Sequence, residues 1–288
     1  MANVLADLVT LLALEKIEDT IFRGQSQDLG WGTVFGGQVL GQALSAAVQT
    51  APAERTVHSF HAYFLRPGDV SKPIVYDVDR ARDGGSFTTR RIVAIQSGEP
   101  IFNMAASFHK HEEGFAHQDP MPDVPPPESV PLDRERFAAA ASRIPKKILE
   151  RFTGEQPFEV RSVDGRNDAF APAAVPADRK VWLKTTARLP DDPALHQYLL
   201  AYASDHALLE TALFPHGVTF LSGVVQVASL DHAMWFHAPL RVDEWLLHVI
   251  HSPVASGGRG LSRGSIFSRD GRLVASTIQE GLIRKRTR

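Results

Sequence analysis

Apolar residues recur with the spacing of one helix face in two segments of the chain. The first is residues 34–48 (VFGGQVLGQALSAAV), whose three glycines lower helix propensity and are expected to allow close packing against a sheet. Its apolar side is formed by Val39, Ala43, Leu44 and Ala47. The second is residues 194–209, which follow LPDDP, where an aspartate can cap the helix and Pro193 suits its first turn. These patterns predict one central helix in each half of the chain.

A block of strand-like sequence follows each helix, and the two blocks repeat. Sliding the chain on itself by 172 residues places residues 59–108 on residues 231–280 without a gap. Each block is an aromatic strand, a proline, a second strand, a glycine turn and a hairpin. The turn signals of the two hairpins are Ser97-Gly98 and Asp270-Gly271. Two copies of a helix followed by a meander of strands predict an α+β fold in which one unit is used twice.

The segments outside the two copies are expected to be helices and linkers. Residues 1–19 favour an amphipathic helix. Residues 119–131 hold six prolines, too many for a helix or a central strand, and we interpret them as a linker. We expect a helix over 132–152, then an irregular stretch to about residue 177, and a second copy that begins near Lys180. The predicted units are an N-terminal unit (1–118), a linker with a helix (119–179) and a C-terminal unit (180–288).

Composition and charge exclude several classes of protein. The 288 residues are 43% hydrophobic and 22% charged, which is typical of a globular protein, and the absence of cysteine excludes disulfides and a cysteine nucleophile. The 31 Lys+Arg against 33 Asp+Glu leave no positive excess for a nucleic-acid backbone. Asp7 interrupts the apolar N-terminal stretch, which argues against a signal peptide, and residues 211–230 are a poor membrane span because they contain Pro215. We therefore expect a cytoplasmic protein with no nucleic-acid partner and no membrane span.

Asp205 is the strongest candidate for chemistry. On a helix over 194–209 it shares an apolar face with Ala201, Tyr202, Leu208 and Leu209. Burial of an unpaired carboxylate costs several kcal/mol and raises its pKa toward a range useful for a general base. In the alternative interpretation, the helix breaks at Ser204 and Asp205 caps a following helix. The spacing does not decide between the two.

Two further candidates lie on predicted strands. Gln279, on a strand over 272–283, shares one face with Leu273, Ala275, Thr277 and Gly281. Its amide could orient a water or a carbonyl, or it could be a residue at a rim or subunit contact. Ser229, on a strand over 223–237, could hold a water, attack directly, or be an ordinary satisfied hydroxyl. Asp231 and His232 follow it as rival acid/base candidates, or as a polar cluster at a strand end.

Other motifs carry less. His58 and His61 are expected on opposite faces of a strand, and so are His232 and His237, so neither pair could bind one metal ion together. We therefore expect no metal. Residues 260–264 fit the G-x-S-x-G pattern of serine hydrolases, but a hairpin follows and no histidine occurs after His251, so we interpret the match as accidental. Arg259 and Arg263, near the second glycine turn, could meet a phosphate, whereas the basic C-terminal tail is interpreted as solvated.

Several strings are more particular. RGQSQDLG, VFGGQVLGQAL, VHSFHAYFLRPGD, HQYLLAYASDHALL, LDHAMWFH and ASTIQEG together closely resemble the acyl-CoA thioesterase II family, from about Leu5 to Ile283. The resemblance implies a double hotdog fold, two fused units in which an antiparallel sheet wraps one long helix. It also implies an active site in which Asp205, Ser229 and Gln279 position a water. Relatives commonly have Thr where this chain has Ser229, and Ser lacks the methyl that restricts rotation of the hydroxyl.

The implied activity is hydrolysis of fatty acyl-CoA by direct attack of that water, with no acyl-enzyme and no cofactor. Arg259, Arg263, His58 and Asp231 are the expected substrate-binding residues, and a homodimer or homotetramer is expected. In the first copy Ser107 falls at the position of Gln279, and no acidic residue in 38–48 matches Asp205. We therefore expect one working site per chain, drawn mainly from the second copy.

Two alternatives remain open at this stage. A hotdog enoyl-CoA hydratase or acyl dehydratase would use His206 or His232 with a nearby aspartate. A non-catalytic acyl-CoA binding module would have lost activity with the change of Thr to Ser. Release of free thiol from a saturated acyl-CoA separates the thioesterase from both.

Overall fold

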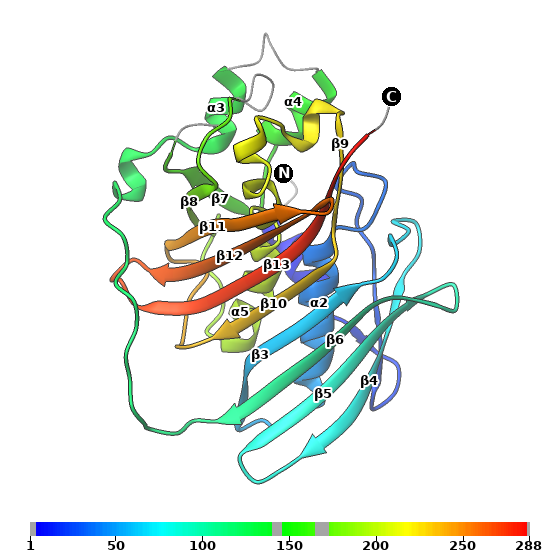
Figure 1. Cartoon of the computed structure of the whole chain (residues 1–288). Helices are drawn as coiled ribbons and strands as arrows, with labels where there is room; N and C mark the ends of the chain where they lie inside the picture. Colours follow the sequence, from blue (N-terminus) through cyan, green and yellow to red (C-terminus); the bar gives the residue numbers. More distant parts are fainter. Residues whose placement is uncertain (1–3, 140–145, 165–172, 287–288) are drawn as a thin grey trace.

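A computed structural model describes residues 4–139, 146–164 and 173–286. One antiparallel sheet wraps two helices that lie side by side against its concave face (Figure 1). The strands follow the order β1-β2-β4-β5-β6-β3-β10-β13-β12-β11-β8-β7, and β9 pairs with β13 outside this path. Two helix-and-sheet units in one chain agree with the α+β arrangement expected from the repeat.

The elements of the first half precede the proline-rich stretch. They are α1 (Val4–Leu12), β1 (Glu15–Lys16), β2 (Ile21–Gly24), α2 (Gly36–Gln49), β3 (Arg55–Phe64), β4 (Ile74–Asp83), β5 (Phe87–Gln96) and β6 (Glu99–Lys110). The next segment holds η1 (Pro127–Ser129), α3 (Asp133–Ala139), α4 (Lys146–Thr153) and β7 (Phe158–Ser162). The remainder holds β8 (Asp178–Thr185), α5 (Pro193–Ser204), α6 (Leu208–Thr211), η3 (Phe214–His216), η4 (Phe220–Ser222), β9 (Val225–Ser229), β10 (Asp231–Phe236), β11 (Leu246–Ser256), β12 (Arg259–Ser268) and β13 (Leu273–Lys285).

The two halves meet where β3 pairs with β10. The register runs from Asp231 opposite Tyr63 to Trp235 opposite Ser59. On either side of this seam the order β3-β6-β5-β4-β2-β1 mirrors the order β10-β13-β12-β11-β8-β7. A pseudo-twofold axis therefore passes through the seam, and the pairing of β3 with β10 joins the sheets of the two units into one.

The two central helices pack against each other in antiparallel directions. A Cβ on Gly37 would collide with the carbonyl oxygen of Tyr202, and a Cβ on Gly41 would lie 3.2 Å from that of Tyr198. The α2 glycines therefore allow close approach to α5, so the expectation that they pack against the sheet was wrong. The N-terminus of α2 consequently meets the C-terminus of α5.

Several predicted boundaries were wrong. The helix expected over 194–209 ends at Ser204, and the strand expected over 223–237 is interrupted at Leu230. Within the segment 132–152 the described residues form α3 and α4, and residues 140–145 between them lie outside the described residues. The stretch expected to be irregular to about residue 177 contains β7, which pairs with β8 at the edge of the sheet. In the described parts of the chain, no helix is both long and apolar enough to cross a membrane.

Candidate active site

Asp205, Ser229 and Gln279 come together from three separate elements. Gln279 Nε2 donates to Asp205 Oδ1 over 2.6 Å and to Ser229 Oγ over 2.9 Å. Ser229 Oγ in turn donates to the same carboxylate oxygen over 3.3 Å. The carboxylate, the hydroxyl and the amide thus form a closed triangle of hydrogen bonds.

Asp205 is held between the ends of the two central helices. It is the residue that follows α5, and its side chain is only 4% exposed. The backbone N–H of Gly37, in the first turn of α2, donates to its carboxylate, and a Cβ on Gly36 would lie 2.7 Å from Oδ2. The helix does break at Ser204, but Asp205 does not cap α6, whose N-cap is Ala207 with no side-chain bond. The first half of the chain therefore supplies one backbone donor to the site.

Burial dominates the electrostatics of Asp205. Desolvation raises its pKa to about 6, against the hydrogen bonds from Gln279, Ser229 and Gly37, which lower it. Apolar rings lie close by, because Phe35 packs on Tyr202 with a centroid distance of 5.1 Å and a Cβ on Gly36 would touch both Phe64 and Asp205 Oδ2. A carboxylate with a pKa near 6 is ionised at neutral pH and still basic enough to accept a proton.

The break at Leu230 fixes where Ser229 and Gln279 lie. Ser229 pairs with Gly281 on β13, so its side chain points to the same face as Gln279, two residues away. Asp231 Oδ1 accepts from the backbone N–H of Glu280 over 2.6 Å and so fastens the start of β10 to β13. Burial raises the pKa of Asp231. The carboxylate of Asp231 holds the backbone next to Gln279.

The loop that precedes α2 is anchored by two buried glutamines. Gln38 Nε2 and Gln42 Nε2 donate to the carbonyl oxygen of Gln25 over 3.0 and 2.9 Å, and Gln38 Oε1 accepts from the N–H of Gln27. Tyr76 OH donates to Gln42 Oε1 over 2.7 Å. These bonds fix the start of α2, whose N–H reaches Asp205. Sequence reasoning missed this contribution, although two glutamines four residues apart inside an apolar helix were a visible signal.

Three other expected substrate-binding residues lie away from the triangle. Arg259 and Arg263 are exposed and alternate along β12 with the buried Ser262, which lies opposite Gln279, so they point to the other face of the sheet. Arg259 pairs with Glu280 over 2.9 Å. His58 bonds Ser107 Oγ over 2.9 Å, and it lies five residues, roughly 17 Å, along β3 from the Tyr63 end of the seam.

The glycines of the G-x-S-x-G match serve packing. A Cβ on Gly260 would lie 2.5 Å from that of Ala212, next to α6, and a Cβ on Gly264 would collide with His248 Nε2. Ser262 faces inward with no hydrogen-bond partner for its Oγ among the described residues. No strand-turn-helix elbow surrounds this serine, because β12 continues into the hairpin with β13.

The matching region of the first half has different residues. Arg90 lies opposite Ala106 where Ser262 lies opposite Gln279, so the position that matches Gln279 is Ala106 and the expected Ser107 was wrong. The slip of one residue comes from the hairpin turns, because Gln96 pairs with Glu99 whereas Phe267 pairs with Leu273.

Arg90 occupies the interior of that region. Its side chain is 1% exposed, its Nη2 donates to Thr50 O and to Asp83 Oδ1 over 2.8 Å each, and its Nε donates to Thr50 Oγ1 over 3.0 Å. Thr50 is the residue that ends α2, as Asp205 is the residue that ends α5. A hydrogen-bonded guanidinium thus lies in the first half, with no carboxylate at the end of its helix.

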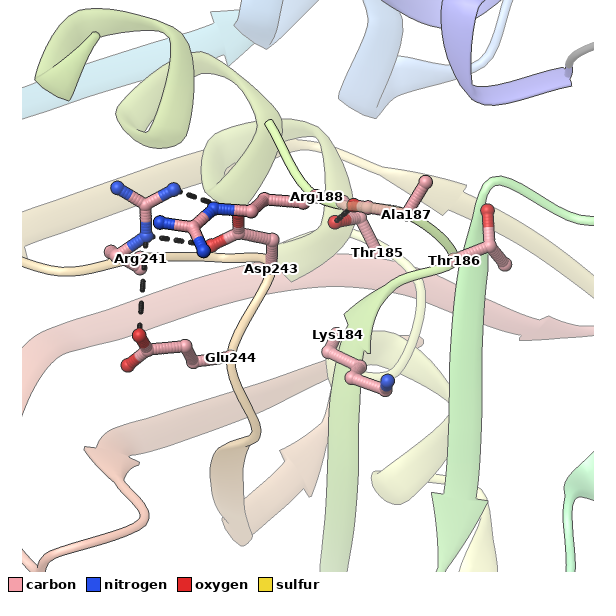
Figure 2. Close-up of a pocket in the computed structure, with 8 residues that line it drawn as sticks. All are labelled: Lys184, Thr185, Thr186, Ala187, Arg188, Arg241, Asp243 and Glu244. Carbon is pink, nitrogen blue, oxygen red and sulfur yellow. Dashed lines mark hydrogen bonds and ion pairs between the residues drawn. The ribbon is translucent and has the colours of Figure 1, made fainter. Parts of the chain in front are cut away.

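A separate pocket of about 310 Å³ opens at the other end of α5, about 18 Å from Asp205 along the helix axis. Figure 2 shows the residues of this pocket. It is lined by Lys184, Thr185, Thr186, Ala187, Arg188, Arg241, Asp243 and Glu244. Arg241 bonds Asp243 over 2.8 Å and also bonds Asp191, so its charge is already compensated. Neither Asp205, Ser229 nor Gln279 lines this pocket. In the ranges that the structure covers, no cluster of three or more His, Asp or Glu could hold a metal ion.

Comparisons with known proteins match this chain along nearly its whole length. A family model described as acyl-CoA thioesterase matches residues 148–282, and a model of the acyl-CoA thioesterase N-terminal domain matches residues 26–109. Acyl-CoA thioesterase 2 of Haemophilus influenzae is 48% identical over 99% of both chains. The crystal structure of an acyl-CoA thioesterase II TesB2 from Mycobacterium marinum is 44% identical, has a TM-score of 0.79, and covers 97% of this chain and 99% of its own.

A more distant likeness concerns the fold alone. A protein of unknown function with a hot dog fold from Alicyclobacillus acidocaldarius has a TM-score of 0.77 at 23% identity, and covers 98% of this chain and 99% of its own. The expected double hotdog arrangement is thereby confirmed.

Proposed function

Because this chain belongs to the acyl-CoA thioesterase family and is a thioester hydrolase, we propose that it hydrolyses fatty acyl-CoA at the site formed by Asp205, Ser229 and Gln279. The observation that carries the proposal is the carboxylate of Asp205, whose side chain is 4% exposed, held by an amide and a hydroxyl and with a pKa of about 6. Burial of an ionised carboxylate costs folding free energy, and proteins commonly retain such costly groups at catalytic sites.

In the proposed reaction Asp205 acts as a general base on a water molecule. The water oxygen attacks the thioester carbonyl carbon while its proton passes to the carboxylate. The tetrahedral intermediate then breaks the carbon–sulfur bond, and the proton on Asp205 passes to the leaving thiolate. The products are a free fatty acid and CoA with a free thiol. General base catalysis of this kind contributes about 10²- to 10⁴-fold to the rate.

Gln279 and Ser229 position the base and the water. Both amide hydrogens of Gln279 are used, one on Asp205 and one on Ser229, which fixes the carboxylate and directs the hydroxyl lone pairs. Gln279 Oε1 is buried and has no hydrogen-bond partner among the described residues, so it is a suitable acceptor for the water. Ser229 donates to the carboxylate and is not the nucleophile in this proposal. Mass spectrometry of enzyme quenched during turnover should therefore find no acyl group on Ser229.

The substrate would approach from the side where the helix ends meet the seam. Phe35 and Phe64 border the start of α2 and offer an apolar surface to the acyl chain. Arg259 and Arg263 lie on the exposed face of the sheet, opposite to the face that carries Gln279. Their contact with the CoA phosphates stays a prediction. Replacing both with Gln should raise KM and leave kcat unchanged if they bind CoA.

The direct test is release of free thiol from saturated acyl-CoA substrates of graded chain length. The wild-type protein should release thiol, and Asp205→Asn should reduce kcat by at least about 100-fold without unfolding. Asp243→Asn is a matched control, because its carboxylate is also buried, at 3% exposed, but lies near the N-terminus of α5 beside Arg241. A hydratase or a binding module would release no thiol, and an Asp205→Asn variant with near-native kcat would remove Asp205 as the base.

A further inference from the structure

A fully buried histidine lies next to the carboxylate of Asp205. His232, on β10, is 0% exposed, and its ring stacks on Phe60 with a centroid distance of 6.0 Å. Its Nδ1 lies 3.9 Å from Asp205 Oδ1 and has no hydrogen-bond partner in the described part of the chain. The mechanism above gives this side chain no role.

The hydrogen bonds of Ser204 determine which ring nitrogen of His232 carries the proton. Ser204 Oγ lies 2.9 Å from the carbonyl oxygen of Ala201 and 3.0 Å from His232 Nε2. A carbonyl oxygen can only accept, so the single hydroxyl proton goes to Ala201 and the hydroxyl oxygen accepts from Nε2–H. Burial lowers the pKa of His232 to about 3, so the ring is neutral and carries one N–H. Nδ1 therefore presents a bare lone pair on the side of Asp205.

We propose that His232 is a positioning residue for the reaction, held by Ser204 in the Nε2–H tautomer so that its Nδ1 lone pair lies beside Asp205 Oδ1; this rests on the proposed function. At 3.9 Å the two atoms are too far apart for a hydrogen bond, but the lone pair disfavours the ionised carboxylate electrostatically relative to the protonated one. The ring thus favours transfer of the proton from the attacking water to Asp205.

Two other titratable groups near this pair, Tyr202 and His248, are neutral under the conditions of turnover. A third, His206, packs on Phe35 and Tyr202 with centroid distances of 4.4 and 5.6 Å. Tyr202, from α5, stays protonated because burial and then the charge of Asp205 raise its pKa. His248, from β11, stays neutral because burial, then His232 and Arg179, lower its pKa to about 3. The remaining partners of Asp205 are the N–H of Gly37 from α2, Ser229 from β9 and Gln279 from β13. Between the two buried histidines, only His232 lies beside Asp205, so its tautomer decides whether a ring lone pair or a ring N–H faces the carboxylate.

The test uses two variants in the full-length protein, each measured as a pH profile of kcat/KM for thiol release. His232→Gln places an amide near the Nε2 position, toward Ser204, and no atom at the Nδ1 position. Ser204→Ala removes the acceptor of Nε2–H, so the ring can place its proton on Nδ1 and donate to the carboxylate. Both changes stabilise the ionised form of Asp205 relative to the protonated form. We expect the midpoint of the acid limb to fall by about one pH unit and kcat to fall about tenfold, with KM unchanged.

Two matched controls separate this role from a structural one. His248 is also fully buried and neutral and also meets a hydroxyl through Nε2, at 3.2 Å from Thr277 Oγ1, and no ion pair joins it to Asp205 among the described contacts. Thr211 is a buried helix residue whose Oγ1 donates to the carbonyl of Ala207 over 3.0 Å, as Ser204 does to Ala201. His248→Gln and Thr211→Val should leave the acid limb where it is in the wild type.

Each outcome decides the proposal. If His232→Gln and Ser204→Ala keep the wild-type acid limb, or if His248→Gln moves it equally, His232 does not position Asp205. If a variant does not fold, ¹⁵N chemical shifts of the His232 ring in the wild-type protein decide instead, since a proton on Nδ1 would overturn the proposal and a proton on Nε2 would support it. Absence of thiol release by the wild-type protein would instead refute the proposed function itself.

Discussion

Replacement of Asp205 by Asn should stabilise the folded protein at neutral pH. Burial raises the pKa of this carboxyl from 3.8 to about 6, a difference of about 2.2. At about 1.4 kcal/mol for each of these roughly two pKa units, the ionised carboxylate costs on the order of 3 kcal/mol of folding free energy above pH 6. Asparagine removes this cost, but its amide NH2 replaces one carboxylate oxygen and cannot accept a hydrogen bond. One of the hydrogen bonds to the carboxylate, such as that from the N–H of Gly37, is then lost, at a cost of about 1 kcal/mol. The expected net gain is about 2 kcal/mol.

The pH dependence identifies the cause of the gain. Between about pH 4 and 6 the native carboxyl holds a proton that the unfolded chain has lost, so the stability of the wild-type protein falls as pH rises through this window. Relative to the wild type, Asp205→Asn should therefore be about 1 kcal/mol less stable near pH 4, gain about 1.4 kcal/mol per pH unit, and stay about 2 kcal/mol more stable above pH 6.

Urea unfolding at fixed protein concentration, repeated from pH 4.5 to 8, measures the difference. The matched control is Asp243→Asn. Burial raises the pKa of Asp243, but the hydrogen bond and charge of Arg241 outweigh it, so its pKa is lowered and the control should lose stability at neutral pH. A wild-type and Asp205→Asn difference that stays constant across the pH range would refute the claim that Asp205 is an ionised base held against desolvation.

Four further outcomes are expected. The rate constant kcat/KM should fall about tenfold per pH unit below about pH 6, because Asp205 must be ionised to accept a proton; an acid limb near pH 4 would contradict this. Ser229→Ala should lower kcat about tenfold, because it removes one hydrogen bond to a charged group, whereas Ser229→Thr keeps the hydroxyl and should retain activity. Equal losses in the two variants would show that the hydroxyl does not contribute. Arg90→Met should lower the free energy of unfolding by about 3 kcal/mol, because Thr50 O and Asp83 lose a buried donor, and should leave kcat unchanged; lost turnover in the folded variant would give the first half a catalytic role. Calorimetry with a non-hydrolysable acyl-CoA thioether should give one ligand per chain, and two would contradict a single site.

The spacing of apolar residues, every second residue in a strand and every third or fourth in a helix, predicted the elements that bury one face against the core. The strand expected over 272–283 matches β13, and its buried face contains Ala275, Thr277, Gln279 and Gly281 as alternation requires. The helix expected over 34–48 matches α2, and the residues of its predicted apolar side, Val39, Ala43, Leu44 and Ala47, are all buried. Local pattern was sufficient in both cases, since burial on the inner face decides the identity of each residue.

Long-range contacts account for the predictions that failed. The ungapped repeat placed Ser107 on Gln279, but the longer turn of the second hairpin shifts the match to Ala106, and turn length does not follow from composition. The substrate-binding role expected of His58 stays a prediction, and its side chain bonds Ser107 near the start of β3. The expectation of a homo-oligomer and of a cytoplasmic location stays a prediction.

The site itself was only partly visible in the sequence. The position of Asp205 on an apolar face indicated a costly carboxylate, and the family resemblance selected Ser229 and Gln279 as its partners. The donor from Gly37 could not be predicted, because the glycines of α2 were assigned to packing against a sheet, and the antiparallel contact of α2 with α5 is a tertiary feature. The tautomer of His232 likewise depends on a hydroxyl 28 residues away in the chain.

The seam between β3 and β10 has a consequence for how this enzyme can be divided. One half carries the carboxylate, hydroxyl and amide, while the other carries the N–H that meets the carboxylate and the strand that completes the ladder. Two separately expressed fragments, divided within the proline-rich stretch 119–131, should each be inactive. Mixing them should restore turnover when β3 of one fragment pairs with β10 of the other.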